Sequence, residues 1–269
     1  MTRTTLMALT VLAGVAACSR PAEPQEEQEE QEEQEEQVLL VFAAASLREP
    51  FTALAHDFQQ AHPGVTITFN FAGTQELRAQ LEQGAAADVL ASADTTSMDA
   101  LVRAGRVQAP ALFASNEPVV VVSRQAAATI TDFAALPRAA KLVVGGPEVP
   151  IGRYTAQILE RADKKLGAGY GARVLEHVVS REPNVKQVLA KVRLGEADAG
   201  VVYRTDALGV AEVTVVAIPA DVNVVAAYPI ALTKVPPHPA MARAFVELVR
   251  SAAGQAALAR AGFLPPAGG

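Results

Sequence analysis

From residue 38 onward, short apolar runs alternate with longer stretches in which apolar residues recur every three or four positions. The short runs predict buried strands, and the longer periodic stretches predict amphipathic helices. The expected strands are 38–42, 65–71, 88–92, 119–123, 141–145, 199–203, 213–218 and 224–230. The expected helices are 47–61, 75–83, 97–104, 152–166, 185–194 and 239–261. Because strands and helices alternate along the chain, the pattern predicts an α/β fold whose sheets are mostly parallel.

The first strand leads directly into a helix start. The apolar run 38–42 is followed by three alanines, Ser46 and, three residues later, Glu49. Serine followed by glutamate at this spacing is typical of a helix N-terminus, where the serine acts as the N-cap. A helix that begins at the carboxyl edge of a sheet presents unpaired N–H groups, which suit an anion. Helix capping alone would also explain Ser46.

Three similar strand-to-helix connections follow; together with the one at Ser46 they are called joints below. Thr74 comes after Gly73 and is expected to cap the next helix, with its hydroxyl and N–H at the sheet edge. Pro150 has no N–H, so the free donors of its helix would begin with Ile151. Asn184 is expected to cap a helix and leave the N–H of Val185 exposed. Capping suffices for each joint alone, but four of them together favour an oxyanion site.

Tyr203 ends the expected strand 199–203. A tyrosine at a strand end is commonly a core-edge residue with a solvated hydroxyl, but this hydroxyl could also donate to an anion. Asp206 is expected to cap the helix that follows.

The first 37 residues have the composition of a targeting segment. Residues 1–17 contain Arg3, an apolar stretch too short to span a bilayer, and small residues before Cys18, as in a secretion signal. The motif around Cys18 resembles a lipobox, which implies lipidation of this cysteine; the alternative is an ordinary signal followed by a stray cysteine. Residues 18–37 are rich in Glu and Gln and are expected to form a solvated tether.

Charge and residue content exclude several function classes. The chain has 23 basic and 29 acidic residues, but residues 1–37 hold nine of the glutamates and two of the arginines, so the remainder is close to neutral. No basic patch interleaved with aromatic residues indicates nucleic-acid binding. No cysteine follows Cys18, the four histidines are dispersed, and the common hydrolase and phosphate-loop motifs are absent. We therefore expect no catalytic residues, no cofactor and no bound metal cation.

Four segments occur in an order that identifies a family. They are Ala43-Ala44-Ala45-Ser46-Leu47 and the stretches 87–94, 149–152 and 195–203. In combination they resemble the periplasmic molybdate-binding proteins of bacterial ABC importers, over nearly the whole of residues 38–264.

The resemblance implies a two-lobed periplasmic-binding-protein type II fold, with mixed sheets flanked by helices and a ligand cleft between the lobes. The first lobe would comprise residues 38–115 and 227–269, and the second lobe residues 116–226. One molybdate or tungstate would be held by uncharged donors. The residues at the matching positions are Ser46, Thr74, Ile151, Val185 and Tyr203.

The resemblance also implies partners and a location. The protein would be a monomeric lipoprotein of the cell envelope, outside the cytoplasm, anchored to a membrane through Cys18. It would deliver its oxyanion to an ABC permease, and it would not be an enzyme. Sulfate, thiosulfate or another tetrahedral oxyanion remains the alternative ligand. Arg48, Arg153 and Arg204 lie near the joints in the sequence, and whether they reach the ligand is left open.

Overall fold

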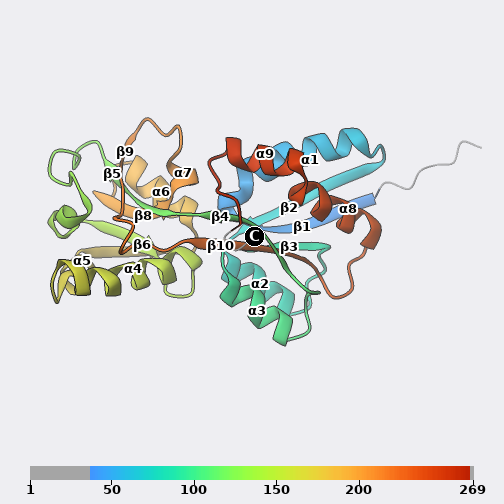
Figure 1. Cartoon of the computed structure of the whole chain (residues 1–269), viewed down its shortest axis with the longest axis horizontal. Coiled ribbons are helices and arrows are strands. Elements are labelled where there is room, and N and C mark those ends of the chain that lie inside the picture. The colour runs from blue at the N-terminus through green and yellow to red at the C-terminus, as the bar shows by residue number, and fades with distance from the viewer. Residues whose placement is uncertain (1–36, 267–269) are drawn as a thin grey trace, which may run out of the picture. The chain divides into compact units, whose positions relative to one another are not determined.

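The computed structural model describes residues 37–266, and two five-stranded sheets lie at the centres of two lobes within this part of the chain (Figure 1). Both lobes belong to one compact unit. The expected signal sequence, Cys18 and the tether up to residue 36 lie outside the described residues.

The sheet of the first lobe has the strand order β2-β1-β3-β10-β4. Its strands are β1 (Gln37–Ala44), β2 (Val65–Ala72), β3 (Val89–Ala91), β4 (Ala111–Asn116) and β10 (Ala226–Leu232). β1 pairs in parallel with β2 and β3, whereas β10 is antiparallel to both β3 and β4. The parallel part therefore sends the ends of β1 and β2 to the same edge, where the first two joints lie.

The sheet of the second lobe has the order β7-β6-β8-β5-β9. Its strands are β5 (Pro118–Ser123), β6 (Leu142–Gly145), β7 (Val178–Glu182), β8 (Ala199–Tyr203) and β9 (Val213–Val216). β6 is parallel to β7 and β8, and β5 is antiparallel to β8 and β9. The expected two-lobed α/β fold with mixed sheets is confirmed. The narrower expectation of mostly parallel sheets is wrong, because β5 and β10 run against their neighbours.

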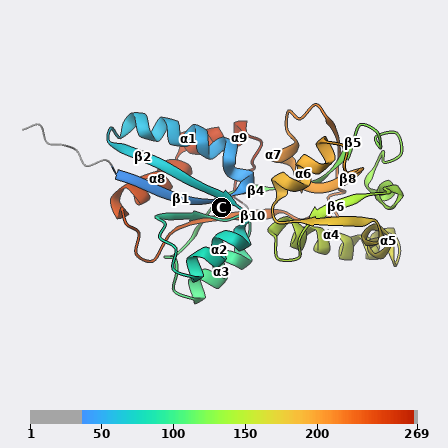
Figure 2. The ribbon, with the colours of Figure 1, turned by 180° about the vertical axis from the view of Figure 1, so that it is seen from behind.

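Helices cover both faces of each sheet (Figures 1 and 2). In the first lobe, one face carries α1 (Arg48–Ala61), α8 (Pro239–Arg250) and α9 (Ala252–Arg260), and the other carries α2 (Thr74–Glu82) and α3 (Thr95–Arg103). In the second lobe, α4 (Pro150–Leu166) and α5 (Tyr170–Glu176) lie opposite α6 (Val185–Arg193) and the short α7 (Arg204–Ala207). Two 3-10 helices are η1 (Ala45–Leu47) and η2 (Phe133–Arg138).

Several elements differ from the sequence-based expectation. β4 was not expected, because its sequence Ala-Leu-Phe-Ala-Ser-Asn lacks a long apolar run, and β7 was not expected because it is an edge strand ending in charged residues. The expected helix 239–261 is two helices. Ser251 separates them, and its hydroxyl accepts a hydrogen bond from the Gly254 N–H at 3.2 Å, which caps α9.

The two cores use different side chains. In the first lobe, the ring of Phe51 on α1 packs against Phe113 and Phe245 at centroid distances of 5.8 Å each. In the second lobe, β5 is buried along its whole length and supplies consecutive valines. A strand buried on both faces reads as a continuous apolar run. These cores hold the strand ends that carry the site.

The chain passes between the lobes twice. β4 of the first lobe ends at Asn116 and β5 of the second lobe begins at Pro118, with Glu117 between them. The return runs from the end of β9 to the start of β10. The lobe boundaries given above from the sequence remain predictions. Two crossovers between lobes are an arrangement in which the lobes can open and close about a ligand.

Candidate anion-binding site

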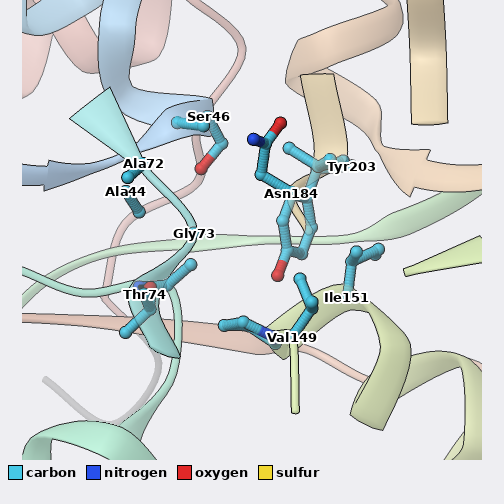
Figure 3. Close-up of a pocket in the computed structure, with 13 residues that line it drawn as sticks. Ala44, Ser46, Ala72, Gly73, Thr74, Val149, Ile151, Asn184 and Tyr203 are labelled. Atoms are coloured by element: carbon cyan, nitrogen blue, oxygen red, sulfur yellow. Dashed lines mark hydrogen bonds between the residues drawn. The ribbon is translucent and has the colours of Figure 1, made fainter. Parts of the chain in front are cut away.

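A small pocket lies between the two lobes, at the edges where their strands end (Figure 3). The part of the pocket that the centre of a water molecule can occupy has a volume of about 20 Å³. By that measure a single water needs about 10–15 Å³, so the free space in the pocket is enough for one small ion. Its lining residues are Ala44, Ala45, Ser46, Ala72, Gly73, Thr74, Ala93, Val149, Pro150, Ile151, Asn184, Val185 and Tyr203. All five residues expected at the site are among them.

Ser46 lies in η1 and does not cap a helix, so the expected capping role is wrong. The residue that precedes α1 is Leu47, and no side chain caps that helix. The Ser46 hydroxyl is instead buried and lies 3.0 Å from the Tyr228 hydroxyl. Figure 3 shows its oxygen directed toward the pocket. A serine that does not cap a helix keeps its hydroxyl available for a ligand.

Thr74 is the first residue of α2, and Gly73 occupies the cap position that we expected for Thr74. The Thr74 Oγ1 accepts a hydrogen bond from the Ala93 N–H at 3.1 Å. Because that bond uses an oxygen lone pair, the hydroxyl hydrogen of Thr74 remains free to donate. The backbone N–H of Thr74 has no acceptor within its own helix, as for every first-turn residue.

Ile151 and Val185 contribute the starts of α4 and α6. Pro150 is the first residue of α4, as expected, so the helix offers its first N–H at Ile151. The expected cap of α6 is confirmed, because Asn184 Oδ1 accepts from the Gln187 N–H at 3.1 Å. That cap leaves the N–H of Val185 without an acceptor in the helix.

Tyr203 ends β8, and its side chain is 1% exposed. Its hydroxyl has no hydrogen-bond partner among the described residues. Burial raises the pKa of Tyr203 well above its ordinary value, so the hydroxyl keeps its proton at neutral pH. In Figure 3 this hydroxyl points into the pocket. An unpartnered buried hydroxyl is costly, and an anion in the pocket would satisfy it.

Among the described residues that line the pocket, none carries a charge. The three arginines left open by the sequence have other partners. Arg153 contacts the Asp94 carboxylate, Arg48 lies 4.6 Å above the Phe71 ring, and Arg204 donates to the Gly262 carbonyl at 3.1 Å. The site thus consists of hydroxyls and helix N-termini, with cations held outside it.

Asp206 does not cap α7, contrary to expectation. It lies inside that helix, fully buried, with Oδ1 3.1 Å from the Lys186 ammonium. Burial raises the pKa of Asp206 to about 6, while the nearby Lys186 acts in the opposite direction. Asp206 lines a larger neighbouring cavity that also includes Ser46, so its charge lies beside the small pocket and not in it.

Contacts across the lobes enclose the pocket. The Gln75 side chain on α2 donates to the Pro183 carbonyl of the second lobe at 2.7 Å. On another side, the Tyr154 hydroxyl on α4 lies 3.4 Å from the Ala93 carbonyl of the first lobe. Together with the ion pair between Arg153 and Asp94, these contacts bring the four joints against one another.

Sequence reasoning missed two residues of the site. Asn184 lines the pocket as well as capping α6. Tyr228 lies behind Ser46 in the middle of β10, and nothing in its local sequence distinguishes it from a core tyrosine. Only the pairing of β10 with β4 and β3 brings it near residue 46.

Residues 37–266 contain no group of three or more His, Cys, Asp or Glu side chains placed to hold a metal ion. No helix in this range is long and apolar enough to cross a bilayer.

Comparisons with known proteins agree with the fold. The molybdate-binding protein ModA of Mycobacterium tuberculosis is 43% identical over 231 residues, which cover 85% of each chain. The structure of the periplasmic molybdate-binding protein of Azotobacter vinelandii has a TM-score of 0.70 at 20% identity, covering 85% of this chain and 99% of that one. The sulfate-binding protein SubI of M. tuberculosis has a TM-score of 0.76 at 19% identity, covering 85% and 87%. These two structural likenesses show the fold alone.

The family is shown by the sequence itself. Residues 39–264 match the family model described as bacterial extracellular solute-binding protein. The match includes every strand end and helix start that lines the pocket. This chain therefore belongs to the family of bacterial extracellular solute-binding proteins.

Proposed function

We propose that this protein is the substrate-binding component of an ABC importer and that it binds molybdate or tungstate between its lobes. The ligand residues would be Ser46, Thr74, Ile151, Val185 and Tyr203. The observation that carries the proposal is the uncharged pocket of one-ion size, in which all five residues lie. The mycobacterial relative named as molybdate-binding supports the choice of oxyanion.

A dianion can be stable in such a pocket without a cationic partner. Burying a charge is costly unless its oxygens are hydrogen-bonded, and hydrogen bonds to an ionised acceptor are stronger than neutral ones. The N-termini of α2, α4 and α6 would each add about half a positive charge. Hydroxyls of Ser46, Thr74 and Tyr203 would complete the set of donors. The donors are fixed by helices and a strand, so little ordering is needed when the ligand binds.

Donors of this kind discriminate by protonation and by size. A fully ionised oxyanion accepts every hydrogen bond offered, whereas hydrogen phosphate brings a proton that needs an acceptor. Sulfate has the same charge as molybdate and is smaller, so its rejection would depend on pocket radius. Sulfate and thiosulfate therefore remain the alternative ligands, and the fold shared with a sulfate-binding protein does not favour them.

The other parts of the proposal concern delivery. We infer that the protein acts outside the cytoplasm, anchored by lipid at Cys18, as a monomer with no catalytic activity and no cofactor. Closure of the lobes on the anion would create the surface that an ABC permease recognises. The family description and the lipobox-like motif support these statements.

Calorimetric titration with molybdate, tungstate, sulfate and phosphate tests the ligand. The proposal predicts dissociation constants for molybdate and tungstate in the nanomolar-to-micromolar range, or about −12 to −8 kcal/mol. It predicts at least tenfold weaker binding of sulfate and phosphate. Stronger binding of sulfate would reassign the ligand, and binding of none of the four would reject the proposal.

A further inference from the structure

A chain of buried hydrogen-bonding groups leads from the first crossover to the pocket. Tyr228 on β10 is fully buried, and its hydroxyl lies 3.0 Å from Ser46 Oγ. Asn116, the last residue of β4, is also fully buried. In the β4–β10 register, Ala114 faces Tyr228 and Asn116 faces Ala226, so Asn116 and Tyr228 are diagonal neighbours on one face.

The direction of hydrogen bonding along this chain can be deduced from a backbone group. The Glu117 N–H can only donate, and it donates to Asn116 Oδ1 at 2.9 Å. The amide nitrogen of Asn116 must therefore face the other way, where it donates to Thr205 Oγ1 at 2.8 Å. Its second hydrogen is available to Tyr228. The diagonal position of Asn116 on the same face of the sheet places that hydrogen beside the Tyr228 side chain.

Tyr228 must then place its own hydrogen on an acceptor. Ser46 Oγ lies 3.0 Å from the Tyr228 oxygen and can accept it. The ring of Tyr228 is held edge-on by Phe263 at 5.3 Å, Phe113 at 6.3 Å and Tyr203 at 5.8 Å between centroids. Because the ring is fixed on three sides, the position of its hydroxyl is fixed as well.

We propose that Asn116 and Tyr228 are positioning residues that orient the Ser46 hydroxyl as a hydrogen-bond donor to the bound oxyanion. Donation runs from Asn116 to Tyr228, from Tyr228 to Ser46 and from Ser46 to the ligand. In the reverse direction, Ser46 would donate to Tyr228 and turn an oxygen lone pair toward the anion, which is repulsive. This inference rests on the proposed function, because it assigns a role at the same site.

The series of hydrogen bonds from Asn116 through Tyr228 to Ser46, which we call the relay, also connects the site to the crossover between the lobes. Thr205, which accepts from Asn116, lies on α7 of the second lobe, whereas Asn116 and Tyr228 belong to the sheet of the first lobe. The hydrogen bond between Asn116 and Thr205 thus ties the first residue of the series to the second lobe.

A double-mutant cycle tests the relay. Molybdate affinity is measured by calorimetry for the wild type, Tyr228→Phe, Ser46→Ala and the double variant. Loss of one oriented hydrogen bond should weaken binding by about 3–10-fold when Ser46 is present. In the Ser46→Ala background, Tyr228→Phe should change affinity by less than about twofold, because the group it orients is gone. A general loss of packing would weaken both backgrounds equally.

A matched control distinguishes loss of the relay from the general effect of removing a buried tyrosine hydroxyl. Tyr170 is buried in the second lobe, donates to the Phe133 carbonyl and lies outside the pocket. Tyr170→Phe should leave molybdate affinity unchanged. If Tyr228→Phe does not fold, Asn116→Leu tests the same point, because it removes the donor to Tyr228 without adding a charge. Asn116→Leu should likewise weaken binding only when Ser46 is present.

The outcomes are distinguishable. If wild-type protein does not bind molybdate, the proposed function fails. If the wild type binds, but Tyr228→Phe or Asn116→Leu has no effect or has equal effects in the wild-type and Ser46→Ala backgrounds, the relay is rejected while the proposed function stands.

Discussion

The ammonium group of Lys186 on the second lobe lies 2.9 Å from the Glu49 carboxylate on the first lobe and 3.1 Å from Asp206 on its own lobe. One lysine thus pairs across the lobes and also compensates a buried acid. The pair with Glu49 is half open to solvent, since the Glu49 side chain is 64% exposed. Its contribution should therefore be small and sensitive to salt.

Glu49→Gln should speed the release of bound molybdate. Loss of a partly exposed ion pair costs about 0–1 kcal/mol, which corresponds to at most about a fivefold faster dissociation. Tyrosine fluorescence in a stopped-flow experiment can follow release, because Tyr203 and Tyr154 adjoin the pocket. The matched control is Glu160→Gln, which removes an exposed pair with Lys164 within α4 alone. Slower release from Glu49→Gln than from the control would contradict a closing role for this pair.

Asp206 predicts a specific pH dependence of stability. Its pKa in the folded protein is about 6, compared with 3.8 for an unperturbed aspartate, because burial disfavours the carboxylate. Between these two values the folded state binds more protons than the unfolded state. The Asp206 contribution to the free energy of unfolding therefore falls as pH rises from about 4 to 6 and is constant above that.

The comparison of wild type with Asp206→Asn isolates this contribution. The free energy of unfolding of the wild type minus that of Asp206→Asn, measured with urea at pH 4, 5, 6 and 7, should decline as pH rises from 4 to 6. The full change is about 3 kcal/mol at most, from the size of the pKa shift. A difference that is flat, or that grows with pH, would show that Lys186 holds Asp206 ionised.

Tyr203→Phe should separate stability from affinity. The Tyr203 hydroxyl is buried and has no partner among residues 37–266, so removing it relieves an unsatisfied group in the empty protein. The melting temperature without ligand should stay the same or rise. Molybdate affinity should fall by about 5–150-fold, because a donor to a buried charge is worth roughly 1–3 kcal/mol.

Tyr170→Phe should show the reverse pattern, with lower stability and unchanged affinity, since its hydroxyl is bonded far from the pocket. If both variants changed stability and affinity alike, Tyr203 would be a structural tyrosine and not a ligand donor.

Gly73→Ala should impair closure of the lobes without unfolding either. The backbone of Gly73 has φ −62° and ψ 139°, which alanine adopts easily. A Cβ there would lie 2.3 Å from the Pro183 carbonyl oxygen, which belongs to the second lobe. We expect molybdate affinity to fall at least tenfold, while the free energy of unfolding stays equal or rises by about 0.4–1 kcal/mol.

Gly146→Ala is the matched control for Gly73→Ala. A Cβ at Gly146 would meet only Val149 Cγ2 at 3.5 Å and the Glu182 carbonyl at 3.7 Å, both in its own lobe. Its affinity should be close to that of the wild type. Equal affinities for Gly73→Ala and Gly146→Ala would mean that the lobes need not approach this closely when the ligand binds.

Much of the candidate site could be predicted from the sequence, because its residues lie at strand ends and helix starts, which local sequence patterns indicate. Strand ends, the proline at position 150 and the asparagine at position 184 are read from neighbouring residues, and they mark the helix starts that line the pocket. The predicted capping roles of Ser46 and Thr74 were wrong, because a cap signal reports only the preference of neighbouring residues. The Ser46 hydroxyl is instead bonded to Tyr228 from the distant strand β10.

The parts that could not be predicted depend on pairing between distant segments. Asp206 is buried because α7 packs against β8 and α6, where it meets Lys186. Tyr228 and Asn116 become neighbours only through the β4–β10 register, and β4 itself carries little strand signal. The break at Ser251 likewise follows from packing of α8 and α9 against α1.

The central claim is that a dianion is held by uncharged donors in the pocket between the lobes. The most direct test is diffraction at the molybdenum absorption edge from crystals grown with molybdate. The account predicts one anomalous peak enclosed by Ser46, Thr74, Ile151, Val185 and Tyr203. A peak beside Lys186 and Arg193 in the neighbouring cavity, with the small pocket empty, would contradict it.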